Sequence, residues 1–201
     1  MYFFVADEHF GHEKILTPEY SDRAAKMNVA NVSEMNEKLI SNHNERVTPQ
    51  DVTIHAGDFC WYKKLAKNGN MYCGAEEIVR RLNGTHIFIK GSHDARLPSS
   101  AKYMWRKMLK VEDTLRFGSC GLAAGWRDQF IVVCHYAMRR WERSHYGSWQ
   151  LHEHSHGRLE SIGLQHDVGV DANNYYPVSL VDLVEIMKHK TQHTHDELRR
   201  T

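Results

Sequence analysis

The stretch 86–94 reads HIFIKGSHD and joins an apolar run, 86–89, to the polar turn Gly91-Ser92-His93-Asp94. An apolar run of this length that ends at a glycine predicts a buried strand followed by a tight turn. In open α/β folds, the side chains just beyond the carboxyl ends of the strands line the ligand site. The stretch therefore predicts an α/β fold with a functional site at one edge of a sheet.

Other apolar runs end in carboxylates or imidazoles in the same way. These runs are 2–6, 52–56, 130–134 and 149–152, and the polar residues that follow them are Asp7, His9, Asp58, His135, His154 and His156. Carboxylate oxygens and imidazole nitrogens are ligands that divalent metals accept. Together with the first stretch, these strand ends predict a site for two metal ions.

The length and the charge balance predict one domain without a strong bulk electrostatic field. The chain has 201 residues, with 26 Lys and Arg against 25 Asp and Glu. A chain of this size buries about 70% of its unfolded surface without needing disulfides. Because the charges nearly cancel, no strong nucleic-acid patch and no attraction to anionic membranes are expected, and a phosphate-bearing substrate must be held locally. We expect residues 1–190 to form the domain and 191–201 to form a polar tail.

The cysteines and the apolar runs predict where the protein resides. The four cysteines contain no CxxC pair, which predicts free thiols in a reducing compartment. No run approaches the ~18 apolar residues of a membrane span, and the N-terminal residues lack the pattern of a signal peptide. A cytoplasmic location is therefore expected.

Apolar residues at helical spacing predict helices in both halves of the chain. The expected helices are 33–47, with Ser33 as its N-cap, 75–82, one from Ser99 or Ser100 to 109, and one that is capped by Ser179. Between them, residues 13–31 are polar with no clear period. Outside the motifs, several histidines lie in polar or terminal stretches and are expected on the surface: His43, His86, His189, His193 and His195.

Most of the second half reads as strands without long helices between them. These runs are 114–117, 129–134, 149–152 and 166–170. Parallel strands need long crossovers, usually helical, whereas neighbouring antiparallel strands do not. We therefore expect a mixed or antiparallel second sheet that packs on the first.

The polar blocks resemble the calcineurin-like metallophosphoesterase family in order and spacing. The blocks are Asp7-x-His9, Gly57-Asp58, Gly91-Ser92-His93-Asp94, His135 and His154-x-His156. Three further stretches, 7–12, His135-Tyr136 and Asp167-Val168-Gly169-Val170-Asp171, are similar to a small branch of bacterial and phage phosphoesterases. The resemblance implies a four-layer α-β-β-α sandwich, in which two mixed sheets are flanked by helices.

The resemblance also implies a set of metal ligands. By similarity, one metal is bound by Asp7, His9, Asp58 and His156, and Asp58 bridges to a second metal that is held by His135, His154 and the residue at position 92. Two cations held in this way lower the pKa of a shared water, which then attacks the phosphoryl group. Mn²⁺ is the expected metal, with Fe, Zn, Ni and Mg as alternatives.

Catalytic and substrate-binding residues follow from the same resemblance. His93 matches the histidine that stabilises or protonates the leaving oxygen, and Asp94 is expected to orient its ring. His12 is a candidate contact for a phosphate oxygen. Arg139 and Arg140 are candidates for clamping a phosphate, or they form a solvated surface pair.

Two positions depart from the family pattern. Ser92 stands where the family has an asparagine whose carbonyl oxygen binds the second metal, and Glu153 stands where a glycine precedes His154. A serine hydroxyl is a shorter and poorer neutral ligand, so the second metal is expected to be held weakly. Glu153 either supports a ligand histidine from behind or faces water.

The sequence therefore supports a metal-dependent phosphodiesterase that acts on a small phosphoester or nucleotide, such as a 2′,3′-cyclic phosphate. Aromatic residues that would stack a nucleobase, or pack in the core, surround the ligands in sequence: Trp126, Tyr136, Trp141, Tyr146 and Trp149. One alternative is a phosphomonoesterase. Another is a weakened member that binds a metal or a nucleotide without turnover, which is motivated by Ser92.

Overall fold

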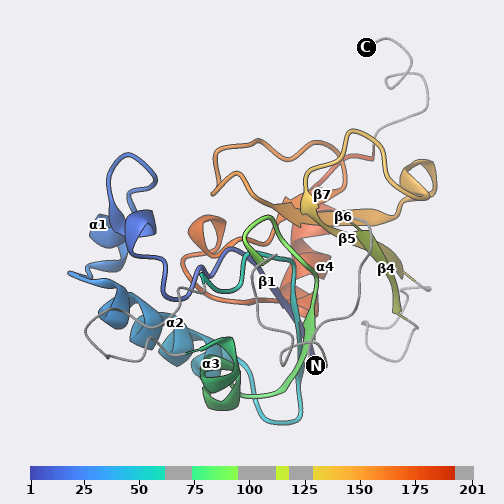
Figure 1. The fold of residues 1–201 in the computed structure, drawn as a ribbon. Coiled ribbons are helices and arrows are strands. Elements are labelled where there is room, and N and C mark those ends of the chain that lie inside the picture. Colours follow the sequence, from blue (N-terminus) through green and yellow to red (C-terminus); the bar gives the residue numbers. More distant parts are fainter. Residues whose placement is uncertain (62–73, 95–111, 118–128, 193–201) are drawn as a thin grey trace.

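A computed structural model describes residues 1–61, 74–94, 112–117 and 129–192 of the chain (Figure 1). The helix expected to end at 109 lies outside these ranges. Among the described residues the chain forms two four-stranded sheets. An α/β fold with a second sheet packed on the first was expected, and both features are confirmed.

The first sheet has the strand order β3-β2-β1-β8. Its strands are β1 (Tyr2–Val5), β2 (Val52–His55), β3 (Thr85–Phe88) and β8 (Val178–Ser179). β1, β2 and β3 run parallel, and β8 is antiparallel to β1. The carboxyl ends of the three parallel strands therefore share one edge, as the polar turns after them require.

The second sheet has the strand order β4-β5-β6-β7. Its strands are β4 (Glu112–Phe117), β5 (Gln129–Tyr136), β6 (Trp149–Glu153) and β7 (Gln165–Asp167). β5, β6 and β7 are parallel, whereas β4 is antiparallel to β5. β7 ends at Asp167, earlier than the run 166–170 predicted, because Gly169 leaves this sheet and forms a bridge with Ala6.

The helices are α1 (Arg23–Met27), α2 (Val32–Arg46), α3 (Ala75–Arg81) and α4 (Leu180–Lys188). α4 begins as predicted, with Ser179 and Asp182 forming a capping box. α2 begins earlier than predicted, because its N-cap is Asn31 and not Ser33. The Asn31 side chain accepts a hydrogen bond from the Glu34 N–H, and asparagine caps a helix as well as serine does.

Short elements were not predicted. Residues 13–31 contain a 3₁₀ turn, Glu13–Leu16, and the helix α1, and β8 has only two residues. Elements this short show too little of a periodic pattern to stand out in the sequence. They form because tertiary contacts hold them.

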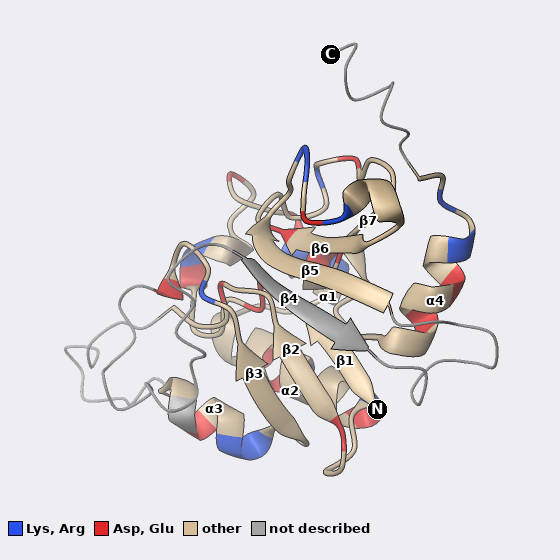
Figure 2. Cartoon of the chain, turned by 90° about the vertical axis from the view of Figure 1, so that its right-hand side faces the viewer, with Lys and Arg blue, Asp and Glu red and all other residues tan. Residues whose placement is uncertain are grey.

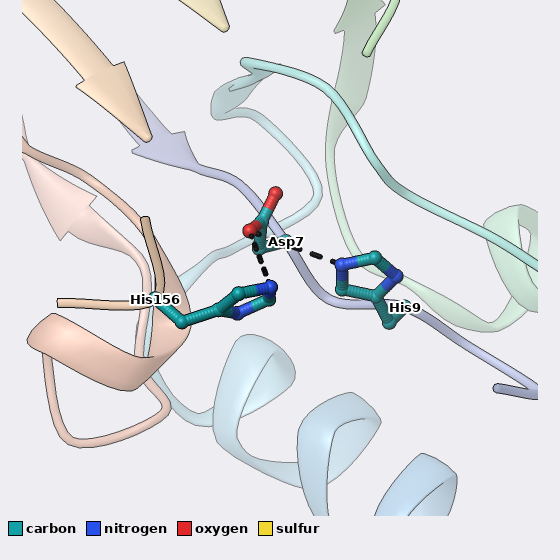
Figure 3. A group of neighbouring side chains, drawn as sticks. All are labelled: Asp7, His9 and His156. Atoms are coloured by element: carbon teal, nitrogen blue, oxygen red, sulfur yellow. Dashed lines mark ion pairs between the residues drawn. The ribbon is translucent and has the colours of Figure 1, made fainter. Parts of the chain in front are cut away.

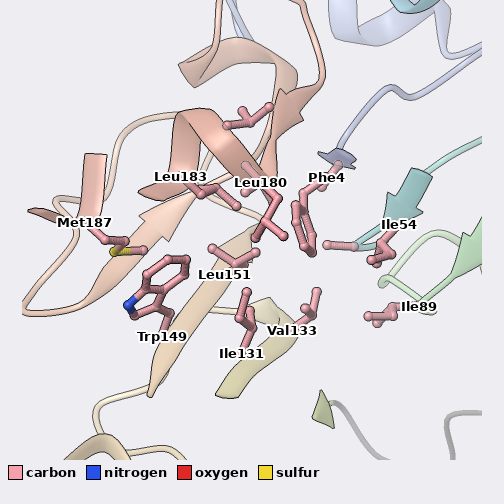
Figure 4. Packing of buried hydrophobic residues seen from close by; sticks show 14 of the residues in the cluster. Phe4, Ile54, Ile89, Ile131, Val133, Trp149, Leu151, Leu180, Leu183 and Met187 are labelled. Carbon is pink, nitrogen blue, oxygen red and sulfur yellow. The ribbon is translucent and has the colours of Figure 1, made fainter. Parts of the chain in front are cut away.

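Alternate side chains of the first sheet face two different layers. Figure 4 shows one of them, the core on the side of the second sheet. Phe4 and Ile54 face the second sheet, where Ile131, Val133 and Leu151 meet them in one core. α4 adds its apolar face to this core and lies beside β1 and β8.

The opposite face of the first sheet is covered by α1, α2 and α3 (Figure 1). Val5 and Phe88 of the sheet pack there against Met35, Leu39 and Ile78. Figure 2 shows acidic residues followed by basic residues along both α3 and α4. Within the described ranges, no helix is both long and apolar enough to cross a membrane. Cys60 and Cys134, the cysteines in these ranges, are buried.

The expectation that His43 and His86 are ordinary surface residues is wrong. His43 is 4% exposed and its Nε2 lies 3.0 Å from the Asn83 carbonyl oxygen, and His86 is half-buried with its Nδ1 3.0 Å from Nε2 of His55. The hydrogen bonds explain why these polar residues are tolerated inside. His189 is exposed, as expected, whereas His193 and His195 lie outside the described ranges.

We predict that Leu183→Ala lowers the free energy of unfolding by about 2–5 kcal/mol, because Leu183 is completely buried between the sheets and truncation leaves a cavity. Val181→Ala, on the same helix but 51% exposed, is the matched control and should cost less than about 0.5 kcal/mol. Urea unfolding of both variants checks this. Equal losses would contradict the packing of α4 described above.

We further predict that acid destabilises the protein partly through His43. Burial lowers the pKa of His43 from its ordinary value of 6.5 to about 3. The folded chain therefore binds fewer protons than the unfolded chain between these values, and stability falls as the pH falls through that window, by about 1.4 kcal/mol per pH unit for one group.

His43→Gln should flatten the pH dependence of the unfolding free energy between about pH 6 and about pH 4 by roughly that amount. His189→Gln makes the same chemical change at an exposed position and is the control. An unchanged slope in His43→Gln would show that His43 is not buried in the neutral form.

Candidate functional site

The structure brings the predicted ligands together as two clusters at the edge where the strands of both sheets end. Asp7, His9 and His156 offer ligand atoms that all lie within 4.8 Å of one another, and so do Asp58, His135 and His154. Figure 3 shows the side chains of His9 and His156 on either side of Asp7. We call these groups the first and the second cluster.

Asp58 lies between the two clusters. Its Oδ2 is 3.3 Å from Nε2 of His135 in the second cluster and 3.9 Å from Nε2 of His9 in the first. Asp7 Oδ2 lies 3.4 Å from Nε2 of His156 and 3.8 Å from Nε2 of His9. A carboxylate in the position of Asp58 reaches both clusters, which is the arrangement expected of a bridging ligand.

The backbone at the ligands adopts an uncommon conformation. Positive φ angles of 53°, 51°, 52°, 86° and 52° occur at Asp7, His9, Asp58, His154 and His156. A non-glycine residue in this left-handed region costs about 1 kcal/mol or more, and such residues cluster at functional sites. The bends turn side chains that follow different strands towards one point.

Two glycines make room for the ligand side chains. A Cβ on Gly91 would lie 2.2 Å from Oδ1 of Asp58, and a Cβ on Gly57 would lie 2.6 Å from Nδ1 of His135. Gly57 also has a φ of +112°. Only glycine fits either position, so the glycines of both motifs are needed by the packing of the site itself.

Several buried polar atoms of the site have no hydrogen-bond partner among the described residues. They are Oδ1 and Oδ2 of Asp7, Nε2 of His9 and Oε2 of Glu153. Leaving a buried polar atom without a partner costs about 1–3 kcal/mol, so native proteins rarely do it. Carboxylate oxygens and an imidazole nitrogen that converge in this way fit a divalent cation.

Glu153 faces the site and does not face water. It is 1% exposed, and its Oε1 accepts a hydrogen bond of 2.8 Å from the His156 N–H. Glu153, Asp7 and His135 also form a third group of candidate ligands. Of the two readings of Glu153, support of the site from within agrees with these contacts.

Burial and neighbouring charges set the protonation of the carboxylates. Burial raises the pKa of Asp7 to about 7, although His135 and His156 oppose the shift. Burial would raise the pKa of Asp58 too, but the hydrogen bond and the charge of His135 hold it well below its usual range. Asp58 is therefore ionised at neutral pH, whereas Asp7 needs a positive partner to be fully ionised.

Ser92 and His93 lie beside the second cluster. Ser92 is exposed and donates a hydrogen bond of 2.9 Å to Oδ2 of Asp58. The ring of His93 is 37% exposed, with Nε2 3.7 Å from the same oxygen. The His93 N–H also donates to Oδ1 of Asp58 at 2.7 Å, which holds the residue at the mouth of the site.

Asp94 has a different role from the one expected. It accepts hydrogen bonds from the backbone N–H groups of Asp58, Phe59 and Gly91, at 2.8, 3.1 and 2.7 Å. Both carboxylate oxygens are thus used by the backbone, so Asp94 ties the turns after β2 and β3 together. This contact fixes Asp58 and positions His93 through the main chain.

Among the substrate-binding candidates, His12 lies beside the first cluster. His12 is buried, with Nδ1 3.4 Å from Nδ1 of His9, and its ring stacks at 4.3 Å on Trp61. Arg139 and Arg140 are exposed on the loop that follows β5. Trp126 lies outside the described ranges.

The sequence reasoning missed three residues at the site. Trp61 lies 4.8 Å from His93 between ring centroids, and Arg23 and Asp171 contact the first cluster from behind. Asp171 stands in the stretch 167–171 that carries part of the family resemblance, which was a usable signal. Arg23 stands in an aperiodic polar segment that offered no such signal.

Comparison with known proteins supports the fold. No protein-family model matches the chain. An uncharacterized protein of Methanocaldococcus jannaschii is 26% identical over 197 residues, which cover 92% of this chain and 90% of that protein. The crystal structure of a protein of unknown function from Aquifex aeolicus matches with a TM-score of 0.59 and 22% identity, over 94% of this chain and 98% of that one. The fold is thus shared along nearly the whole chain.

We predict two unequal metal-binding events in a calorimetric titration with Mn²⁺. The first cluster is largely enclosed, whereas the second includes the exposed His154, has the exposed Ser92 beside it, and should bind more weakly. Asp58→Asn should weaken both events more than about tenfold, because it neutralises a shared ligand. Ser92→Asn should tighten only the weaker event.

The matched control for this titration is Asp22→Asn, an exposed carboxylate that pairs with Lys26 at 3.0 Å. It should leave both events unchanged. Two equal events, or an Asp58→Asn variant that binds like the unsubstituted protein, would contradict the proposed ligand sets.

Proposed function

We propose that the protein is a metal-dependent phosphoesterase of the calcineurin-like type and that it acts on phosphodiesters. The observation that carries the proposal is a single one: two clusters of carboxylate and imidazole ligands share Asp58 at the common edge of two sheets. Bridged pairs of divalent metals are typical of enzymes that displace a group at phosphorus. The finer fold that we propose with it is the four-layer α-β-β-α sandwich, of which the described residues supply the α1–α3 layer and both sheets.

Two divalent cations, for which Mn²⁺ is our first choice and Fe, Zn, Ni and Mg are alternatives, would supply Lewis acidity at the phosphoryl oxygens and an acidified water. Asp7, His9, Asp58 and His156 would hold the first, and Asp58, His135 and His154 the second, with Ser92 beside it. The unpartnered atoms of Asp7 and His9 support this assignment. Lone pairs that nothing else uses are what a cation requires.

His93 is the proposed proton donor to the leaving oxygen. Its ring is partly exposed at the mouth of the site, and its backbone N–H is anchored to Asp58. A positioned imidazole that protonates the leaving group accelerates such reactions by about 10²–10⁴-fold. The ring of Trp61, which stacks on the buried His12, lies next to it and offers a surface for a planar group of the substrate.

The charge near the clusters favours a diester over a monoester. A terminal phosphate is a dianion and calls for cationic side chains, as in the guanidinium clamps of many phosphate sites. The guanidinium of Arg23, which contacts the first cluster from behind, is buried and bonded to Asp171 and to main-chain carbonyls. A diester carries a single negative charge and needs less compensation.

One observation supports a second candidate function, a member that binds metal and nucleotide with little turnover. The Ser92 hydroxyl donates its hydrogen to Asp58, the carboxylate that both clusters share. A hydroxyl used in this way is a weaker ligand than the amide oxygen of the family pattern. The second cluster would then fill only at high metal concentration.

We predict that added Mn²⁺ switches on hydrolysis of a bis-aryl phosphate more strongly than hydrolysis of the matching mono-aryl phosphate. Asp58→Asn should abolish the activity, and His93→Ala should lower kcat by about 10²–10⁴-fold without changing Mn²⁺ affinity. The exposed His189→Ala serves as the control substitution. Turnover is measured by release of the aryl alcohol after removal of metal and after its return.

Each outcome of this experiment decides between the candidates. A preference for the mono-aryl ester would favour the phosphomonoesterase. Metal binding without turnover in the unsubstituted protein, together with turnover in Ser92→Asn, would favour the weakened binding member. Absence of both binding and turnover would overturn the proposal.

A further inference from the structure

Arg23 is a fully buried arginine whose polar atoms are all directed at the first cluster or at its support. It has no solvent-exposed surface, although an arginine is almost never buried completely unless it is paired. Its Nε and Nη2 donate to the two carboxylate oxygens of Asp171, at 3.0 and 2.5 Å. Its Nη1 and Nη2 donate to the main-chain carbonyls of Glu8 and Asp7, at 3.0 and 2.9 Å.

Asp171 connects this arginine to a candidate ligand. Its Oδ2 lies 2.8 Å from Nδ1 of His156, and Nε2 of the same ring lies 3.4 Å from Asp7 Oδ2. A proton held on Nδ1 by the carboxylate leaves the lone pair on Nε2, which faces the first cluster. Histidines that bind metals are oriented by carboxylates in just this manner, and the loss of such a partner costs about 10–100-fold in metal affinity or activity.

The main chain brings Asp171 to this position. The Val170 N–H donates to the Ala6 carbonyl at 3.0 Å, so the turn Val170–Ala172 is attached to the end of β1, directly before Asp7. Arg23 then holds the carbonyls of Asp7 and Glu8, within the bend where Asp7 and His9 have positive φ. The pair thus contacts both chain segments that supply the first cluster.

Stability alone does not account for the pair. Removing two charges from water is costly, and a buried ion pair is often replaced by apolar residues with no loss of stability. Despite burial, the hydrogen bond from His156 and the charge of Arg23 keep the pKa of Asp171 well below its usual range.

The second cluster has no matching arrangement among the described residues. His154 is exposed, and its Nδ1 lies 3.2 Å from Nε2 of His135. His135 Nδ1 lies 3.2 Å from a main-chain carbonyl, that of Ala56. A carboxylate backed by a buried guanidinium is therefore a feature of the first cluster.

We propose that Arg23 and Asp171 are positioning residues of the first metal position: Asp171 fixes the tautomer and the orientation of His156, and Arg23 holds Asp171 and the Asp7–His9 bend. This inference rests on the metal centre of the proposed function. It adds a specific claim, that the affinity of the first position depends on a pair that touches neither metal nor substrate.

The test compares metal affinity in two neutral double variants. Arg23→Gln with Asp171→Asn keeps the shape of the pair and leaves no lone buried charge. Arg81→Gln with Glu37→Gln neutralises another bidentate pair, which joins α3 to α2 at 2.8 and 2.5 Å on the surface, and is the matched control. Mn²⁺ affinity is measured by calorimetry, the Co²⁺ visible absorption spectrum reports ligand geometry, and thermal unfolding without metal verifies the fold.

We expect the Arg23/Asp171 variant to fold, to lose about 10–100-fold of Mn²⁺ affinity at the tighter event, and to show a changed Co²⁺ spectrum. The control variant should match the unsubstituted protein in Mn²⁺ affinity, in its Co²⁺ spectrum and in thermal unfolding. In a His156→Ala background, Asp171→Asn should weaken binding little further, because Asp171 acts through His156. This comparison of Asp171→Asn with and without His156 tests the claim even if the Arg23/Asp171 double variant folds poorly.

The outcomes separate this inference from the proposed function. Suppose that the Arg23/Asp171 variant binds Mn²⁺ as tightly as the unsubstituted protein and has the same Co²⁺ spectrum. This result would overturn the positioning role but would leave the proposed phosphoesterase activity unaffected. An equal loss from Asp171→Asn with and without His156 would overturn it as well. Weakened binding in a protein that hydrolyses no phosphoester would support the positioning role and overturn the proposed activity. An unsubstituted protein that binds no metal would overturn both.

Discussion

Two carboxylates, those of Asp7 and Asp58, are buried at the junction of the two sheets, and the surrounding structure depends on how their charge is balanced. Each is about 1% exposed or less. An ionised carboxylate out of water is costly unless a positive partner or hydrogen-bond donors face it. Asp58 receives N–H and O–H donors from the turn after β3, whereas the oxygens of Asp7 have no hydrogen-bond donor among the described residues. Because Asp58 has hydrogen-bond donors and Asp7 has none among the described residues, Asp7 is the carboxylate that most needs a cation nearby.

The path of the backbone follows from gathering these groups at one point. Parallel strands deliver their carboxyl ends to a common edge, and a strand end normally sends successive side chains to opposite faces. The left-handed φ angles at the ligands reverse that alternation, and Gly57 and Gly91 leave the space that the side chains occupy. Asp94 connects the turn after β2 to the turn after β3, because its carboxylate accepts hydrogen bonds from three backbone N–H groups of these turns.

The two clusters differ in how tightly the protein encloses them. The first is bounded by buried residues and by the Arg23–Asp171 pair, so its side chains are held in place by the protein itself. The second is bordered by His154 and Ser92, which are both exposed. The second cluster, beside the partly exposed ring of His93, is therefore the more open to solvent of the two.

The sequence by itself determined the strands that carry the site, the glycine turns, and the chemical types and spacing of the candidate ligands. These features are local, because an apolar run and the polar turn after it lie within a few residues of each other. Only the tertiary structure decided that Asp94 bonds to the backbone, that Glu153 faces inwards, that His43 is buried, and that Arg23 meets Asp171. Arg23 and Asp171 are 148 positions apart, and no periodic pattern in a single sequence connects residues that only folding brings into contact.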